Sequence, residues 1–367
     1  MRSGVSIAFL LISPIGEKQV IIILNAINKL MAIFGYPAIN TNLIGATLFS
    51  GGGIVDSAFV DNGINPTYGV ECNPKDPKLS AGMRSVYRSN FDRYGGRLFE
   101  TTVEDFATNY LDQIELELDV LHASPMCSNF SVASRAGEKY EDIRQAWAVC
   151  KAIETTLPRM FTLENVTDYE ESDSLQSIVN TLKTNGYRTI QGVLNCADFG
   201  VPQARRRFWL IARRDEFLPQ LPKPSEDKIS WYDAIADIIP FMDCVDFTDN
   251  EKLAIAMHKK DHKALLLRRF RSKANLNQAV RTPDQPCFTI VKSWFDDGKG
   301  NGRTNTVDVW LRGSDCGFTL GLEAYKRLQT IPAWYDFYGA CIRVAGSIVG
   351  YSVPAKMYDS ILKVNVL

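Results

Sequence analysis

The sequence predicts an α/β protein, in which a mostly parallel sheet carries a small basic insert and is completed by the C-terminal segment. Two observations lead to this fold class. From residue 43, short apolar runs rich in β-branched residues alternate with longer mixed segments, and some of those segments have helical periodicity. Strands separated by helices imply βαβ units and therefore parallel strands. Past residue 218 the alternation fades, and helix-like patterning returns near residue 318.

The expected elements of the larger domain follow in chain order. We expect helices at 143–157 and 174–186, and strands at 43–49, 67–71, 118–123, 160–165, 188–194 and 207–213. The last two strands are close enough to form a hairpin. A proline-rich connector, "LPQLPKPSED", follows at residue 218. We therefore divide the chain into an N-terminal extension (1–40), a main domain (41–217), an insert (218–317) and a closing segment (318–367).

The N-terminal extension is apolar but does not have the pattern of a membrane anchor. Its run "SGVSIAFLLISPIG" is interrupted by Glu17 and Lys18, before it reaches the roughly 20 residues that span a bilayer. A secretory signal is the less favoured alternative, because no small-residue cleavage site follows. We expect an extension that packs on the domain, or sequence upstream of the true start, and no contact with a membrane.

Charge and cysteine usage restrict the function classes. The net charge is −1, so attraction to nucleic acid must be local. From Lys252 to Arg281, inside the insert, nine residues are Lys or Arg and only one is acidic. The eight cysteines form no CxxC pair and are accompanied by three histidines. We therefore expect free thiols in a reducing compartment, rather than a zinc site or a disulfide framework, and no metal ion.

A ligand site is expected where the parallel strands end. In "TLFSGGGIVDSAF" (47–59), a strand enters three glycines and then a helical pattern, so the backbone can approach a ligand beside a helix N-terminus. Glu71 ends the next strand, where an acid can accept hydrogen bonds from ribose hydroxyls. Together, the glycine turn and Glu71 favour a site for a nucleoside-containing cofactor. The alternative is that the glycines form a plain tight turn and that Glu71 is a surface residue. The phosphate-binding G-x-x-x-x-G-K-[ST] pattern is missing, which argues against ATP hydrolysis.

Candidate catalytic residues fall at the same sheet edge. Cys127 follows a strand within the segment "HASPMCSNFS", whose Pro, Ser and Asn residues are poor core material. Glu164 ends another strand, and Arg205, Arg206 and Arg207 lie at the mouth of the hairpin. The alternative interpretations are that Cys127 is an inert buried thiol, that Glu164 is an exposed strand end, and that the arginines form a solvated basic turn. Together, however, a thiol, an acid and arginines are suited to covalent catalysis.

The ordered set of motifs resembles the DNA (cytosine-5)-methyltransferase family of bacterial type, from about residue 43 to residue 362. Single motifs are weak, but their order is specific. Departures from the family pattern occur at Met126, Ser128 and Tyr351, and the third motif is unclear around Thr102 and Val103. The matching segments, in order, are "FSGGG", "GVECNP", "SPMCSNFS", "ENV", "QARRR", "LEAYKRLQTIPAWY" and "GYSVP".

This resemblance implies a Rossmann-like class I fold that binds S-adenosylmethionine, and it implies a role for each matching residue. Cys127 would add to C6 of a flipped-out cytosine, and Glu164 would hold N3 and the exocyclic amine. Arg207 would hold the O2 side of the base, and Arg205 would help at a phosphate or at the Cys127 loop. The cofactor-binding residues would be Phe49, Ser50, Gly51, Gly53, Glu71, Asp105, Pro125, Ser352 and Val353.

The resemblance also implies partners. Residues 252–281 would bind double-stranded DNA through phosphate contacts, and the insert would recognise a short specific sequence. We expect a cytoplasmic, DNA-associated monomer of prokaryotic or phage origin. A cognate restriction endonuclease acting separately is compatible with this role. Two alternatives stay open: a transfer RNA cytosine-5 methyltransferase, and a catalytically silent, methyltransferase-like protein that only binds DNA.

Overall fold

A seven-stranded sheet forms the centre of the larger domain. The computed structural model describes residues 31, 33, 35–37, 43–114, 117–126, 130, 137–268, 278–292 and 307–366. The strand order is β3-β2-β1-β4-β5-β7-β6. Strands β1 to β5 run parallel to one another, whereas β7 is antiparallel to both β5 and β6. The strands are β1 (Ile44–Leu48), β2 (Asn65–Val70), β3 (Arg97–Phe99), β4 (Val120–Ala123), β5 (Met160–Asn165), β6 (Arg188–Asn195) and β7 (Arg206–Arg213).

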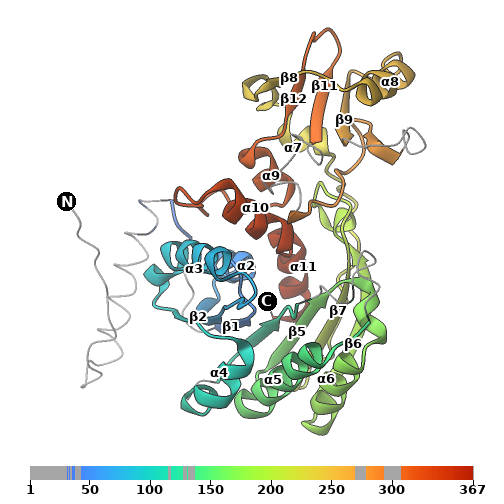
Figure 1. The fold of residues 1–367 in the computed structure, drawn as a ribbon. Coiled ribbons are helices and arrows are strands. Elements are labelled where there is room, and N and C mark those ends of the chain that lie inside the picture. The colour runs from blue at the N-terminus through green and yellow to red at the C-terminus, as the bar shows by residue number, and fades with distance from the viewer. Residues whose placement is uncertain are drawn as a thin grey trace, which may run out of the picture.

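Helices cover both faces of this sheet and make three layers (Figure 1). Two separate hydrophobic clusters lie on opposite sides of the strands. One face is covered by α4 (Val103–Asn109), α5 (Tyr140–Thr156) and α6 (Asp173–Thr184). The other is covered by α2 (Ile54–Asp61), α3 (Pro77–Phe91) and α11 (Ala355–Asn365), with α10 (Ile342–Tyr351) against α3. The expected α/β class, the six expected strands and the expected hairpin are confirmed.

Burial explains why the central strands are readable in the sequence. Strand β5 is buried along its whole length, which is typical of a parallel strand covered on both faces. Strand β3 has only three residues and was not expected, because so short a run carries little periodic signal. The order of strands reverses between β1 and β4, and ligands of such sheets bind in the crevice at this point.

A second sheet of five short antiparallel strands is formed by the insert, and its strand β12 runs two residues past the expected boundary at residue 317 (Figure 1). Its order is β10-β9-β11-β12-β8. The strands are β8 (Cys244–Val245), β9 (Ala264–Arg268), β10 (Val280–Arg281), β11 (Val307–Leu311) and β12 (Gly317–Thr319). The helices around it are α7 (Trp231–Ile235), α8 (Asp249–His258) and α9 (Leu322–Leu328). None of its strands was expected, because two to five residues are too few for a clear alternation.

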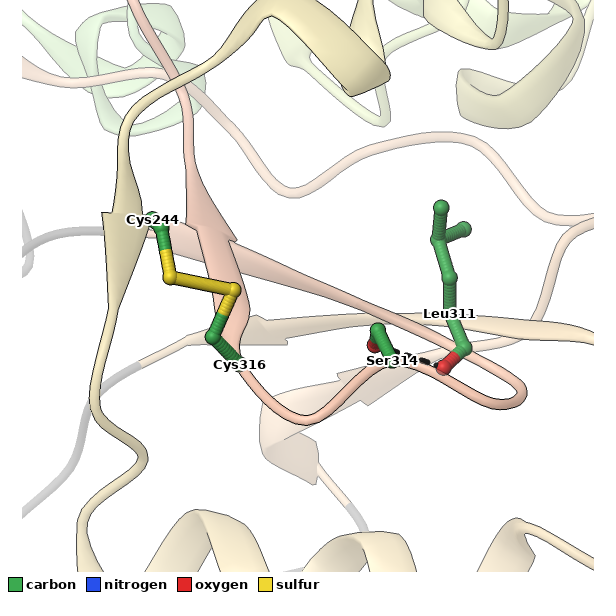
Figure 2. Close-up of a disulfide and its surroundings, with 4 residues drawn as sticks. All are labelled: Cys244, Leu311, Ser314 and Cys316. Atoms are coloured by element: carbon green, nitrogen blue, oxygen red, sulfur yellow. Dashed lines mark hydrogen bonds between the residues drawn. A yellow bond between two sulfur atoms is a disulfide. The ribbon is translucent and has the colours of Figure 1, made fainter.

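The expectation that the cysteines are free thiols is wrong for two of them. Figure 2 shows a disulfide between Cys244 in β8 and Cys316, which directly precedes β12. Strands β8 and β12 pair with Val245 opposite Gly317, and this pairing leaves the two Cα atoms 5.9 Å apart. Because the two residues are 72 positions apart in the chain, their spacing could not reveal the pairing. The other described cysteines are free.

The N-terminal extension contacts the domain at Tyr36. The guanidinium of Arg93 lies 3.8 Å from the centre of the Tyr36 ring, and the Trp334 ring is 6.4 Å away. The remainder of the expectation for residues 1–40 falls mostly outside the described residues. Among the helices that the structure describes, all are too short or too polar to cross a bilayer.

Candidate active site

The glycine loop after β1 is shaped by residues in left-handed conformations. Phe49, Gly51 and Gly53 have φ angles of 61°, 58° and 86°. At Gly53 a Cβ atom would lie 2.3 Å from the Phe91 ring, and at Gly52 it would lie 2.7 Å from the Ile348 side chain. The loop therefore packs tightly against α3 and α10, so space excludes a side chain at both positions, and the positive φ of Gly53 adds to this requirement.

Glu71 faces this loop from the end of β2, as the sequence predicts. Its Oε2 accepts a hydrogen bond from the Gly51 backbone N–H at 3.0 Å, and its Oε1 accepts one from the Ser80 hydroxyl at 3.1 Å. Burial raises the pKa of this carboxyl above its usual value. A carboxylate has about four lone-pair positions, so the two bonds leave acceptor capacity for ribose hydroxyls. The loop and the acid thus fit a nucleoside-containing cofactor.

The next two strands bring further predicted residues to the same edge. Asp105 is exposed in the first turn of α4, after β3, where the Thr102 hydroxyl caps its backbone N–H at 3.1 Å. Pro125 is buried after β4, and its carbonyl accepts a hydrogen bond from the Asn165 side chain at 3.1 Å. This bond joins the end of β5 to the segment that leads to Cys127. Cys127 itself lies outside the described residues.

Glu164 and Arg207 form a partly buried ion pair at this edge. The Arg207 Nε lies 3.0 Å from the Glu164 Oε1, and the two side chains are 17% and 7% exposed. The pair forms because β7 runs antiparallel to β5, which brings its first residues beside the last residues of β5. Burial raises the pKa of Glu164, although the charges of Arg207 and Arg205 act in the opposite direction.

Arg205 is buried, which argues against the expected contact with a DNA phosphate. The residue is only 2% exposed, and the Cys127 loop, its other expected partner, lies outside the described residues. Its guanidinium donates to the carbonyl of Ile290 at 3.0 Å and to that of Gly350 at 3.3 Å. Arg205 therefore joins the turn before β7 to the insert and to α10, which is a structural role. A run of three arginines does not show which of them faces inward.

The last predicted cofactor residues, Ser352 and Val353, follow α10. Val353 is buried in the core, and the Ser352 carbonyl accepts a hydrogen bond from the Gln329 side chain at 2.7 Å. Gln329 also bonds Gln203, whose Oε1 accepts from the Ile290 backbone N–H at 2.9 Å. The two glutamines thus connect three motifs that are far apart in the sequence. Both glutamines belong to motifs that are readable in the sequence, but no local pattern reveals that they contact each other.

The strand order and the residues at the carboxyl edge define a Rossmann-like, S-adenosylmethionine-dependent methyltransferase fold. The structure of the Dnmt2 methyltransferase of S. pombe has the same fold, with a TM-score of 0.59 and 14% sequence identity, over 88% of this chain and 98% of that one. The model of the family described as C-5 cytosine-specific DNA methylase matches residues 45–289. The chain belongs to this family, whose methyl donor is S-adenosylmethionine.

Curated relatives agree with this family membership. The Type II methyltransferase M1.BsuMI of Bacillus subtilis (strain 168) is 31% identical over 360 residues, which cover 85% of this chain and 78% of the relative. The Type II methyltransferase M.NgoBI of Neisseria gonorrhoeae is 30% identical over 152 residues, which cover 39% of this chain and 48% of the relative. The chain spans about half the length of several of the curated relatives that it matches.

Proposed function

We propose that this protein methylates C5 of cytosine within a short specific sequence of double-stranded DNA, using S-adenosylmethionine. The observation that carries the proposal is the partly buried pair of Glu164 and Arg207, at the end of β5 that is bonded to the segment leading to Cys127. A carboxyl and a guanidinium held together in this way can bind the polar edge of a flipped-out base. Membership of the family supports the same reaction.

The nucleophile would be the Cys127 thiolate. Its attack on C6 forms an S–C6 bond, and the C5–C6 π electrons become available at C5. When bound, S-adenosylmethionine supplies an electrophilic sulfonium methyl group for this carbon. Removal of the C5 proton by a base then returns an electron pair to the ring and expels Cys127 as thiolate, which leaves 5-methylcytosine.

Glu164 would hold the base during this reaction. Burial raises the pKa of Glu164 and therefore favours the protonated form of its carboxyl group. In that form the carboxyl can donate a hydrogen bond to N3 while its second oxygen accepts one from the exocyclic amine. Arg207 would donate to O2 of the base and balance the negative charge that develops on the ring. Both groups act at the carboxyl edge of the sheet, from the neighbouring strands β5 and β7.

The cofactor would lie against the glycine loop. Gly51 and Gly53 let the backbone approach the ligand, and Glu71 would accept from the ribose hydroxyls. Asp105 is exposed in the first turn of α4, after the neighbouring strand β3, and would bind the adenine amine. The remaining residues proposed to line this site are Phe49, Ser50, Pro125, Ser352 and Val353.

DNA would be held by the insert, which we propose to be the target-recognition domain. Helix α8 carries an exposed lysine at position 252, and two further exposed lysines, Lys259 and Lys260, directly follow it. Such side chains suit phosphate contacts, while a few others would read bases. Residues 269–277 of the predicted basic region lie outside the described residues. We further propose that the protein acts as a monomer on prokaryotic or phage DNA, independently of any cognate endonuclease.

The test is methyl transfer from tritiated S-adenosylmethionine to unmethylated duplex DNA of mixed sequence, with transfer RNA as a second substrate. We expect label in DNA as 5-methylcytosine, and none with Cys127→Ser. Cys341→Ser is the matched control, because Cys341 is a free and exposed thiol, and it should keep full activity. Glu164→Gln should lower kcat about 10²-fold or more, as loss of a preorganised charged group does. Label in transfer RNA alone, or no transfer by folded protein, would overturn the proposal.

A further inference from the structure

A buried carboxyl lies directly behind the glycine loop. Asp56, in the first turn of α2, is 0% exposed. The Thr47 hydroxyl donates to it at 3.1 Å, and the Tyr87 hydroxyl donates at 2.9 Å. Both partners are neutral, so burial of this carboxylate is unfavourable for folding. An apolar residue of the same shape would avoid the desolvation cost, which suggests that the carboxylate serves something besides stability.

The Thr47 hydroxyl forms hydrogen bonds with Asp56 and with Ser50 of the glycine loop. The Thr47 and Ser50 hydroxyl oxygens are 2.7 Å apart. Each hydroxyl has one proton, and a carboxylate can only accept. When Thr47 donates to ionised Asp56, the bond between the hydroxyls therefore requires that Ser50 donates to Thr47. The carboxylate thus accepts the Thr47 proton in a hydrogen bond, and the Ser50 hydroxyl is left to donate to the Thr47 hydroxyl, to the Thr47 carbonyl at 3.0 Å or to the Val70 carbonyl at 3.3 Å.

Ser50 connects the two halves of the proposed cofactor site. Its hydroxyl oxygen accepts from the Val70 backbone N–H at 2.9 Å, in the residue directly before Glu71. Its carbonyl accepts from the Gly53 backbone N–H at 2.9 Å, which closes the glycine turn. With its hydroxyl proton donated to one of these oxygens, Ser50 offers the Val70 N–H an acceptor. The Ser50 side chain therefore adds to the backbone bond from the Ser50 N–H to the Val70 carbonyl, which is 3.0 Å long, in holding the loop beside Glu71.

We propose that Asp56 is a positioning residue for the cofactor, which acts through Thr47 and Ser50 to hold the glycine loop in place against the end of β2. The inference rests on the proposed use of S-adenosylmethionine by this chain. Asp56 does not contact the ligand in this scheme. Asp56 positions the groups that contact the ligand, so its loss weakens cofactor binding more than it slows the chemical step.

The experiment measures binding of S-adenosylhomocysteine to the full chain by titration calorimetry. Asp56→Asn and Thr47→Val should each raise Kd about tenfold, the change expected for loss of one hydrogen bond to a charged group. Thr47→Ser keeps the hydroxyl and should stay within about twofold of wild type, although it removes a buried methyl group. Asp61→Asn is the control, because Asp61 lies on the same helix but is exposed and bonds Trp334.

Steady-state methylation adds a second readout. The KM for S-adenosylmethionine should rise about tenfold in Thr47→Val, with kcat within about twofold of wild type. A packing role alone would make Thr47→Ser the more damaging change and would overturn the proposal, as would unchanged binding in Thr47→Val and Asp56→Asn. Failure of the wild-type protein to bind S-adenosylhomocysteine would instead overturn the cofactor assignment, and this inference with it. Melting temperatures of the ligand-free variants identify any that fail to fold.

Discussion

Asp56 should make the protein less stable as the pH rises through neutrality. Burial raises the pKa of this carboxyl from its usual 3.8 to about 7, although the hydrogen bonds from Tyr87 and Thr47 lower it. The folded state therefore holds a proton that the unfolded state has already lost. A group with a raised pKa in the folded state contributes stability at low pH, and this contribution is lost as the pH rises through the folded pKa.

The size of the effect follows from proton linkage. With a folded pKa of about 7 and an unfolded pKa of 3.8, the contribution of Asp56 to the free energy of unfolding falls by about 1.4 kcal/mol from about pH 6 to about pH 8. Replacement of Asp56 by Asn removes this dependence, because an amide does not titrate. The difference between the two proteins in their response to pH therefore isolates the one carboxyl.

His122 makes such a comparison necessary, because it acts in the opposite direction. Burial lowers the pKa of His122 from 6.5 to about 3. The unfolded chain then binds a proton near neutral pH that the folded protein does not bind, so this residue raises stability by about 0.8 kcal/mol over the same interval. His122 is present in both proteins, and its effect cancels when the variant is subtracted from wild type.

The assay is urea unfolding of ligand-free wild type and Asp56→Asn, followed by circular dichroism at about pH 6, 7 and 8. We expect the variant to gain about 1.4 kcal/mol relative to wild type between the lowest and the highest pH. Parallel pH profiles for the two proteins would refute the reasoning, since they would mean that Asp56 does not change its ionisation in this interval.

Three further predictions concern other parts of the molecule. Arg205→Met should lower the free energy of unfolding by about 3 kcal/mol in urea melts, because it leaves buried carbonyls without a donor, while DNA affinity of the folded variant stays unchanged. Alkylation without reductant should leave Cys244 and Cys316 unmodified in peptide mass spectra, and Cys244→Ser should destabilise the protein by about 2 to 4 kcal/mol. Substitution of Lys259 and Lys260 by Ala should flatten the plot of log affinity for duplex DNA against log salt concentration by about 0.9 for each phosphate that the variant no longer neutralises.

Local sequence was sufficient for much of the fold and for the edge where the site lies. The expected strand at 160–165 has the bounds of β5, because its burial on both faces demands a continuous apolar run. Glu71 was placed correctly because an acid at the end of a second strand has few other uses in such a sheet. The sequence also placed Glu164 and Arg207 at one edge, but their ion pair depends on the antiparallel pairing of β7 with β5, which was not predicted.

Interactions across long sequence separations could not be found in this way. The short strands of the insert carry too little periodicity to predict, so the bond between Cys244 and Cys316 stayed hidden. The inward turn of Arg205 depends on carbonyls in two distant segments, at Ile290 and Gly350.

By itself the sequence determined the α/β class, the central strands, the glycine turn and the acid that follows it. These features arise from periodicity, β-branched content and backbone freedom, which act over a few residues. Tertiary structure alone decided which arginine is buried, which cysteines meet, and that Asp56 lies behind the glycine loop with hydroxyl partners. Each of these outcomes depends on packing and desolvation among segments far apart in the chain, and no local pattern encodes that energy.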